Sequence, residues 1–276
     1  MVFAALLALA GDVMPVAMAV EVVAEDPSAP RAALPVNGCK RLTHEQARHV
    51  VCHFDVGRLP LRLWLTDEEG ERFGTFARLR EWLAARGQKL VFAMNAGMYT
   101  PRYNPAGLYI EEGALKKKIN LRRGFGNFHL LPNGVFWIGA GRAGVMESHA
   151  FDKAFRAGRL RPRFATQSGP MLVINGRLHP KFRRDSTSRK IRNGVGVRAN
   201  GRDVFFVLSE SRVNFHAFAR LFRDVLKTPD ALFLDGTISR LFALGIREES
   251  NLIPFGPIVG LALPAKEGAM HKEGKK

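Results

Sequence analysis

Short apolar runs separated by turn residues constrain the fold of this 276-residue chain more than any other feature of its sequence. Each run is too short for a typical helix, and Gly, Asn, Asp or Pro follows most of them, which is the pattern of buried strands. We predict strands at residues 50–55, 61–65, 90–94, 108–111, 128–131, 135–138, 171–174, 195–198, 204–208, 231–234 and 258–263.

Turn residues between these runs predict hairpins. An Asn-Gly dipeptide at 200–201 lies between the strands predicted at 195–198 and 204–208, and it is the strongest short hairpin signal in the chain. A Pro-Asn-Gly sequence at 132–134 predicts a second hairpin turn between the two strands that flank it. Hairpins join neighbouring strands in antiparallel pairs, so the sheet is expected to be largely antiparallel.

Helical periodicity occurs in two segments. Apolar residues recur at helical spacing over residues 73–86, and Gly87 follows as a stop signal. Residues 214–226 place phenylalanine and leucine side chains on one helical face. Strands and helices do not alternate regularly, which disfavours a doubly wound parallel sheet. The predicted fold class is therefore α+β, a mixed, largely antiparallel sheet with packed helices in a single domain.

The net charge limits the expected partners. Lys+Arg number 42 against Asp+Glu 25, which gives a formal net charge of +17. Such a field attracts anions, whether nucleic acid, anionic lipid or a phosphorylated glycan. No nucleic-acid-binding motif is recognisable, so we expect no nucleic-acid partner. A hydrophobic content of 46% is that of a globular protein and excludes wholesale disorder.

The N-terminus has the pattern of a secretory signal. Residues 1–10 are apolar and an Ala-Met-Ala cleavage pattern follows at 17–19, although no Lys or Arg precedes Arg31. The apolar run is too short to cross a membrane, so we predict a periplasmic or secreted protein without a transmembrane span. The predicted signal peptide, linker, folded domain and disordered basic tail occupy residues 1–19, 20–38, 39–265 and 266–276.

Cys39 and Cys52 are the two cysteines of the chain. They lack the C-x-x-C spacing of catalytic or metal-binding pairs. In an exported protein they are expected to form one disulfide, which closes a loop near the start of the fold. Two inert buried thiols are the alternative.

Three clusters pair a polar residue with a glycine beside an apolar strand. They are Asn-Ala-Gly-Met-Tyr at 95–99, Ser-Gly-Pro at 168–170 and Asp-Gly-Thr at 235–237. Each cluster alone is typical of a turn, but together they indicate a site built by loops on a rigid sheet. The basic run at 181–193 is rich in hydroxyls and suits a phosphate, although a solvated surface loop has the same composition.

Other chemistries lack motif support. The sequence contains no G-x-S-x-G, no P-loop and no zinc-binding spacing of His and Cys. It therefore requires no cofactor, and it does not decide whether a divalent metal is needed. Asp235, at the end of an apolar strand, is the best carboxylate candidate, and Glu210 is the second. His216, near the start of the second predicted helix, is the histidine we include among the substrate-binding candidates.

The order of these clusters, together with Arg192, Gly196 and Ser239, resembles the phosphodiester glycosidase family and in particular its bacterial exported branch. The resemblance covers residues 50–261. It implies an exported hydrolase that cleaves a sugar-1-phosphate diester, or a related glycosidic bond, in an anionic envelope glycan. The alternative is a non-catalytic binder of anionic glycan or lipid headgroups on the same fold.

The resemblance also implies roles for individual residues. Asp235 is expected to be the general acid/base or nucleophile, and Arg192 to pair with the phosphate. The family commonly has Asp-Gly-Gly-Gly-Ser, whereas Thr237 and Ile238 replace two of its glycines here, which predicts a narrower or reshaped pocket. The expected substrate-binding residues are Asn95, Gly97, Ser168, Gly169, His216, Gly236, Thr237 and Ser239.

Overall fold

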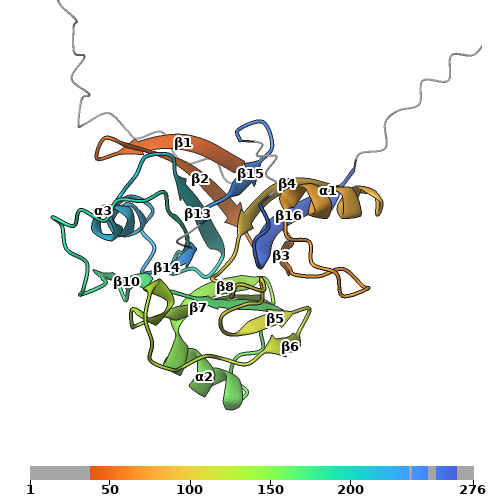
Figure 1. The fold of residues 1–276 in the computed structure, drawn as a ribbon, viewed down its shortest axis with the longest axis horizontal. Coiled ribbons are helices and arrows are strands. Elements are labelled where there is room, and N and C mark those ends of the chain that lie inside the picture. The colour runs from red at the N-terminus through yellow and green to blue at the C-terminus, as the bar shows by residue number, and fades with distance from the viewer. Residues whose placement is uncertain (1–37, 236–237, 248–252, 266–276) are drawn as a thin grey trace, which may run out of the picture. The chain divides into compact units, whose positions relative to one another are not determined.

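Three antiparallel sheets form the framework of the protein (Figure 1). The computed structural model describes residues 38–235, 238–247 and 253–265, all within a unit that spans residues 34–276. The predicted signal peptide and tail, almost all of the predicted linker, and the site candidates Gly236 and Thr237 lie outside the described residues.

Every strand pair in the described part of the chain is antiparallel. The seven-stranded sheet has the order β1 Gly38–His44, β2 Ala47–Asp55, β13 Asp203–Ser209, β12 Asn193–Val197, β14 Asp230–Asp235, β10 Met171–Ile174 and β11 Arg177–Leu178. The four-stranded sheet has the order β15 Leu241–Ala243, β4 Gln88–Asn95, β16 Ile258–Pro264 and β3 Leu61–Trp64. The five-stranded sheet has the order β6 Ala114–Lys117, β5 Tyr109–Glu111, β9 Phe164–Ser168, β7 Gly134–Gly139 and β8 Arg142–Glu147.

Helices contribute less than the α+β prediction implies. The described residues contain three α-helices, and each packs on a different sheet, so the fold is sheet-rich and largely antiparallel. No helix in this part of the chain is long and apolar enough to cross a membrane. The helical elements are α1 Phe76–Ala84, α2 Ser148–Arg156, α3 Phe215–Arg220, the 3-10 helix η1 Asn127–His129 and the π-helix η2 Leu221–Val225.

The central core lies where the three sheets pack together. Phe54 of β2, Phe92 of β4, Phe136 of β7 and Phe206 of β13 are at most 1% exposed. The ring of Phe206 lies 5.0 Å from that of Phe92 and 5.7 Å from that of Phe136, measured between centroids. Aromatic side chains from all three sheets therefore hold the sheets against one another.

The Asn-Gly hairpin prediction is confirmed, whereas the Pro-Asn-Gly prediction is wrong. β12 pairs with β13 around residues 200–201. Residues 128–131 form no strand: residues 127–129 form the 3-10 helix η1, and the side-chain amide of Asn133 donates to the carbonyl of Phe128 at 2.9 Å. β7 instead pairs with β8, and Ala140 and Gly141, both with positive φ, make the turn.

Both predicted helices form, within shorter bounds. The side chain of Thr75 accepts a hydrogen bond from the backbone N–H of Arg78, so α1 begins at Phe76 rather than at residue 73. The segment predicted as one helix at 214–226 is capped by Asn214 and divides into α3 and η2. The sequence did not predict the helix α2, because few of its side chains are apolar and buried. Phe151 is the main buried apolar side chain.

The predicted disulfide between Cys39 and Cys52 is confirmed, and it joins directly opposed residues of β1 and β2. β1 is the edge strand of its sheet, so the bond fastens a strand that has only one neighbour. The sequence separation is 13 residues. We expect the double substitution of both cysteines by Ala to lower the free energy of unfolding by about 3 kcal/mol.

Denaturant unfolding with and without reductant measures this effect. The native chain is expected to lose stability on reduction, and the double variant to be insensitive to reductant. Equal sensitivity of the two proteins would contradict a stabilising disulfide.

His49 on β2 is a buried group that makes stability depend on pH. It is 2% exposed, and its burial, assisted by the nearby His44, lowers the pKa of His49 from 6.5 to about 4. As the pH falls between these values, the unfolded chain binds a proton that the folded chain does not. The contribution of the neutral His49 to the free energy of unfolding is therefore fully present above pH 6.5. It is lost as the pH falls towards 4, and it amounts to at most about 3 kcal/mol.

Denaturant unfolding at pH 7 and at pH 4.5 checks this expectation. The His49→Gln variant is expected to have a flatter pH dependence than the parent protein. The exposed His149, replaced by Gln, is the matched control and should leave the slope unchanged. A slope that survives in His49→Gln assigns the effect to other groups.

Candidate active site

The ends of strands from all three sheets bring polar side chains together. Asn95 is the last residue of β4, Ser168 the last of β9 and Asp235 the last of β14, while Asn193 is the first of β12. All four are buried, and Asp235, which is 4% exposed, is the most accessible of them. The structure thus assembles three sequence-predicted residues, and adds Asn193, at the junction of the sheets.

Asn95 holds the carboxylate of Asp235. Its amide nitrogen donates to Oδ2 of Asp235 at 2.7 Å and also to the carbonyl of Ile238. Its amide oxygen accepts the backbone N–H of Arg240 at 2.8 Å. Because donor and acceptor atoms of the amide are both engaged, the orientation of Asn95 is fixed, and one oxygen of the carboxylate is fixed with it.

Asn193 completes this network from the neighbouring strand. Its amide nitrogen donates to Oδ1 of Asn95 at 2.7 Å, and its amide oxygen accepts the backbone N–H of Asp235 at 2.9 Å. Asn193 and Asp235 are paired across β12 and β14 next to an irregularity in the register. Sequence reasoning missed Asn193 as a site residue because it closes a basic run. Its position just before the predicted strand at 195–198 was the available signal.

Two serine hydroxyls fasten the backbone on either side of Asp235. Ser168 donates to the carbonyl of Leu234 at 2.7 Å. Ser239 lies 3.2 Å from the carbonyl of Asp235 and 3.3 Å from that of Ile191. The predicted residues Ser168 and Ser239 therefore lie beside Asp235, and in this structure they position its backbone.

Packing explains the two described glycines among the candidates. Gly97 has a φ of +126°, and a Cβ there would lie 2.7 Å from Oγ1 of Thr166. A Cβ on Gly169 would lie 2.6 Å from that of Asn133. Protein atoms fill the space beside both glycines, so each is needed for the close approach of β9 and its neighbours.

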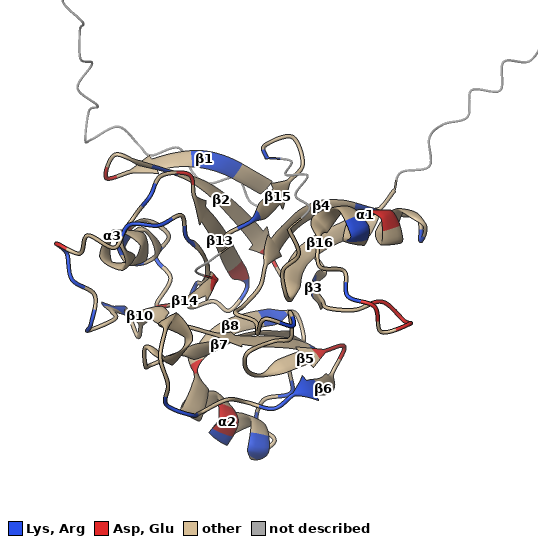
Figure 2. Cartoon of the chain, viewed as in Figure 1, with Lys and Arg blue, Asp and Glu red and all other residues tan. Residues whose placement is uncertain are grey.

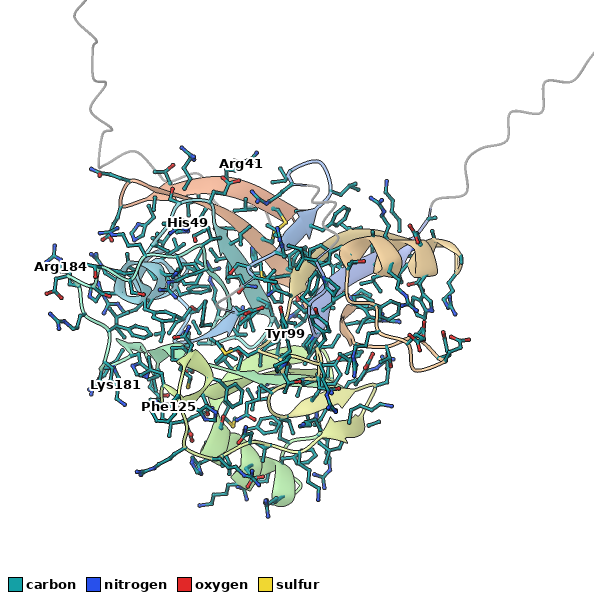
Figure 3. All side chains as sticks on the ribbon, viewed as in Figure 1. Arg41, His49, Tyr99, Phe125, Lys181 and Arg184 are labelled. Carbon is teal, nitrogen blue, oxygen red and sulfur yellow. A yellow bond between two sulfur atoms is a disulfide. The ribbon has the colours of Figure 1, made fainter. Side chains whose placement is uncertain are left out.

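Tyr99 is a further site residue, which the sequence placed only within the cluster at 95–99. Its burial and the negative charge of Asp235 raise the pKa of Tyr99 to about 12, so the phenol keeps its proton at neutral pH. The ring of Tyr103 lies 5.8 Å from that of Tyr99. Figure 3 shows Tyr99 in the region where the sheets meet. The half-buried phenol offers a hydrogen-bond donor near the carboxylate.

Arg192 is buried against aromatic rings. It is 2% exposed, and its guanidinium carbon lies 3.6 Å from the ring centroid of Phe215. It donates to the carbonyls of Val213 at 2.9 Å and Ser188 at 3.0 Å, and no carboxylate among the described residues forms an ion pair with it. Burial lowers the pKa of Arg192 to about 10, which leaves it charged at neutral pH.

Two other candidates lie apart from the Asp235 network. His216 is on α3 with Arg220, Glu45 and Arg184 as charged neighbours, and burial and the charge of Arg220 lower its pKa. Glu210, the second carboxylate candidate, lies 3.3 Å from Arg41 and 3.3 Å from Arg247. These ion pairs give Glu210 a structural role outside the strand-end cluster.

The predicted basic loop at 181–193 reaches the molecular surface. Figure 3 shows Lys181 and Arg184 at the periphery of the protein. The side chain of Asn214 donates to the carbonyls of Arg184 and Ser186, each at 3.1 Å, and so ties the loop to the start of α3. Within residues 38–235, 238–247 and 253–265, no group of three His, Cys, Asp or Glu residues is arranged to hold a metal.

Comparison with known proteins supplies the class of protein. The family model described as phosphodiester glycosidase matches residues 88–254, a range that includes Asn95, Asn193 and Asp235. The chain belongs to this family. It is 38% identical over 185 residues to the uncharacterised protein YigE of Escherichia coli strain K12, and the match covers 67% of this chain and 70% of YigE.

A solved structure has a similar fold. It is the catalytic domain of zebrafish N-acetylglucosamine-1-phosphodiester alpha-N-acetylglucosaminidase, auto-inhibited by its pro-peptide. The two chains superpose with a TM-score of 0.51 and 15% sequence identity, and 81% of each chain is covered. At this identity the likeness concerns the fold of the two proteins.

Proposed function

We propose that this protein is an exported hydrolase that cleaves a sugar-1-phosphate diester, or a related glycosidic bond, in an anionic envelope glycan. The observation that carries the proposal is the Asp235 carboxylate, oriented by the amide of Asn95 at 2.7 Å within a phosphodiester glycosidase family domain. A carboxylate held in this way acts as general acid/base or as nucleophile at the sugar carbon.

Neighbouring groups support the same reaction. The guanidinium of Arg192 is buried but stays charged, and no carboxylate in the described part of the chain forms an ion pair with it, so its field favours a phosphate group near the start of β12. The phenol of Tyr99 and the amide of Asn95 supply hydrogen-bonding groups beside Asp235. We assign Ser168 and Ser239 to the same site, where they position the backbone around Asp235. Gly236 and Thr237, outside the described residues, stay predictions as substrate-binding residues.

The location outside the cytoplasm rests on two observations. Disulfides persist in oxidising compartments, and Cys39–Cys52 is such a bond. The apolar start of the chain and its Ala-Met-Ala pattern at 17–19 match a cleaved signal. We therefore propose a periplasmic or secreted enzyme, which would meet envelope glycans directly.

Hydrolysis of a panel of sugar-1-phosphate diesters tests the function. The panel varies the sugar, its anomeric configuration and the alcohol on the far side of the phosphate, and product release is followed by chromatography. We expect turnover of at least one member and none by the Asp235→Asn variant. Absence of turnover across the panel would contradict the proposed reaction.

A non-catalytic binder of anionic glycan is the second candidate. Thr237 and Ile238 stand where the family commonly has glycines, and larger side chains there favour binding without the usual substrate approach. A binder would retain the panel compounds with an affinity that falls as salt is raised, and would release no product. Measuring retention and product release on the same samples separates the two functions.

A further inference from the structure

A basic segment without acidic residues lies outside the proposed active site. Residues 113–146 contain no Asp or Glu. The first part of this stretch, residues 114–125, is named the basic segment here, and its cations are Lys116, Lys117, Lys118, Arg122 and Arg123. All of these side chains are exposed, and none forms an ion pair with another described residue. Figure 2 shows the positive charge on β6, where the segment begins.

The same segment exposes large apolar side chains. Phe125 is 100% exposed and Leu115 is 46% exposed. Figure 3 shows Phe125 at the edge of the molecule. Single apolar residues are common on protein surfaces, but a wholly exposed aromatic ring next to a run of cations is the composition of an interfacial membrane anchor.

The segment is held in place by the fold. The backbone N–H of Asn120 donates to Oε1 of Gln167 at 2.8 Å, and Nε2 of Gln167 donates to the carbonyl of Asn120 at 2.8 Å. The side chain of Asn120 also donates to the carbonyl of Ala106 at 3.2 Å. Gln167 belongs to β9 and precedes Ser168. The cations are thus presented by a fixed backbone, so little ordering entropy is lost when they meet a ligand.

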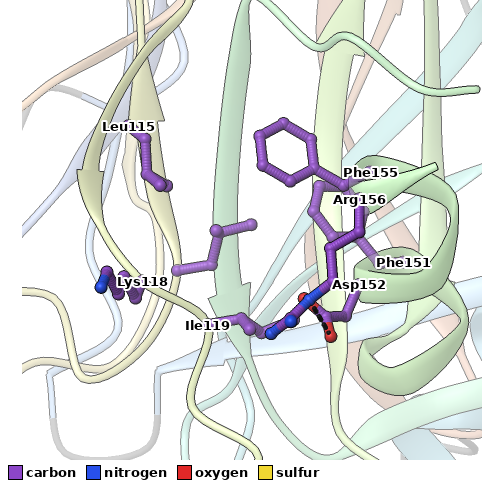
Figure 4. A pocket seen from close by; sticks show the side chains of 8 residues that line it. Leu115, Lys118, Ile119, Phe151, Asp152, Phe155 and Arg156 are labelled. Atoms are coloured by element: carbon purple, nitrogen blue, oxygen red, sulfur yellow. Dashed lines mark hydrogen bonds and ion pairs between the residues drawn. The ribbon is translucent and has the colours of Figure 1, made fainter. Parts of the chain in front are cut away.

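An apolar pocket of about 310 Å³ adjoins the segment. Figure 4 shows Leu115 of the segment on one side of this pocket and Phe155 of α2 on the other, with Ile119 beside Arg156. Lys118 lies at one side, and the ion pair between Asp152 and Arg156 lies at the other. An apolar pocket beside the ammonium group of Lys118 suits an amphiphile that carries negative charge at its polar end.

We propose that the basic segment docks the protein on a membrane surface rich in anionic phospholipid. The lysine and arginine side chains meet lipid phosphates, while Phe125 and Leu115 enter the boundary between headgroups and acyl chains. A polyanionic glycan would satisfy the cations but would leave Phe125 and the apolar pocket without partners. The proposal is independent of the reaction proposed for Asp235.

Co-sedimentation with vesicles tests this docking. The full chain is mixed with phosphatidylcholine vesicles, with and without 30% phosphatidylglycerol, and the bound fraction is measured at several salt concentrations. We expect binding only to the anionic vesicles, weakened by salt. Neutralising Lys116, Lys117 and Lys118 together to Gln should lower the partition coefficient by on the order of a hundredfold. Phe125→Ser should lower it by about tenfold.

A matched variant separates the surface from the overall charge. Replacing the exposed Arg80 of α1, Lys89 of β4 and Arg177 of β11 by Gln removes the same charge from other surfaces, and binding should stay within about twofold of the parent protein. Equal losses in the two triple variants would overturn the proposal, because net charge alone would then account for binding. Poly(glycerol phosphate) that competes fully, with Phe125→Ser behaving as the parent, would assign the segment to an anionic polymer instead.

Discussion

Replacement of Asp235 by Asn is expected to reduce turnover by about a thousandfold or more while leaving the fold unchanged. The carboxylate is the group that can take or give a proton, or attack the sugar carbon, and an amide does neither at neutral pH. The new side chain has the same shape, and its amide oxygen can still accept the hydrogen bond that Asn95 now donates to Oδ2. Single-turnover rates on the hydrolysed substrate measure the loss.

Asp230→Asn is the matched control for this prediction. Asp230 is the first residue of β14, whereas Asp235 is its last, and Asp230 accepts the backbone N–H of Asn175 at 3.0 Å. Burial raises the pKa of Asp230, so the control removes a partly buried carboxylate from the same strand. We expect parent-like turnover from it. Parent-like turnover from Asp235→Asn, with a melting temperature within about 3 °C of the parent, would remove Asp235 from the mechanism.

Local sequence signals predicted those parts of the fold that local interactions decide. The turn at the Asn-Gly dipeptide, residues 200–201, is closed by local hydrogen bonds, such as that from the backbone N–H of Gly201 to the carbonyl of Arg198 at 2.9 Å, and it joins β12 and β13. Local features mark both ends of α1: the side chain of Thr75 caps its start, and Gly87, with a positive φ, follows its end. Residues 128–131 have the composition of a strand, but the chain forms η1 there, and the side chain of Asn133 donates to the carbonyl of Phe128. A pattern of apolar residues cannot reveal such a capping bond.

The candidate site shows the same division. Asn95 and Asp235 each follow an apolar run, and Ser168 stands with Gly169 just before one, so the sequence marked them one by one. Their meeting depends on three sheets that share one core, and such packing involves contacts far apart in the chain. Asn193 contacts Asp235 because the two residues are paired across β12 and β14. The register of these strands shifts next to this pair, and no local sequence signal indicates the shift. Arg192 was marked by the family resemblance, whereas its aromatic surroundings come from α3 and β14.

Replacement of Asn95 by Asp, a side chain of nearly the same shape, is expected to destabilise the network around Asp235. In Asn95→Asp, a second carboxylate would replace the nitrogen that now donates to Oδ2 of Asp235 at 2.7 Å. Two carboxylates at this distance in a buried site cannot both be ionised, so one must take up a proton. The variant should therefore lose about 3 kcal/mol of stability at pH 8 and recover part of it as the pH falls to 5.

Asn95→Leu separates the charge effect from the loss of the hydrogen bonds. Leu removes the same donors and acceptors from a residue that is 0% exposed, but it adds no ionisable group. Its stability should be lowered by a similar amount at pH 5 and at pH 8, measured by denaturant unfolding against the parent at each pH. Recovery at low pH in Asn95→Asp alone would establish that the amide of Asn95 faces the carboxylate of Asp235. The free energy of unfolding of Asn95→Asp at pH 8 could instead equal that of the parent. The amide of Asn95 would then not donate to Asp235, and the orientation assigned to the carboxylate would be wrong. Two buried charges at hydrogen-bonding distance repel one another strongly enough to lower the measured stability.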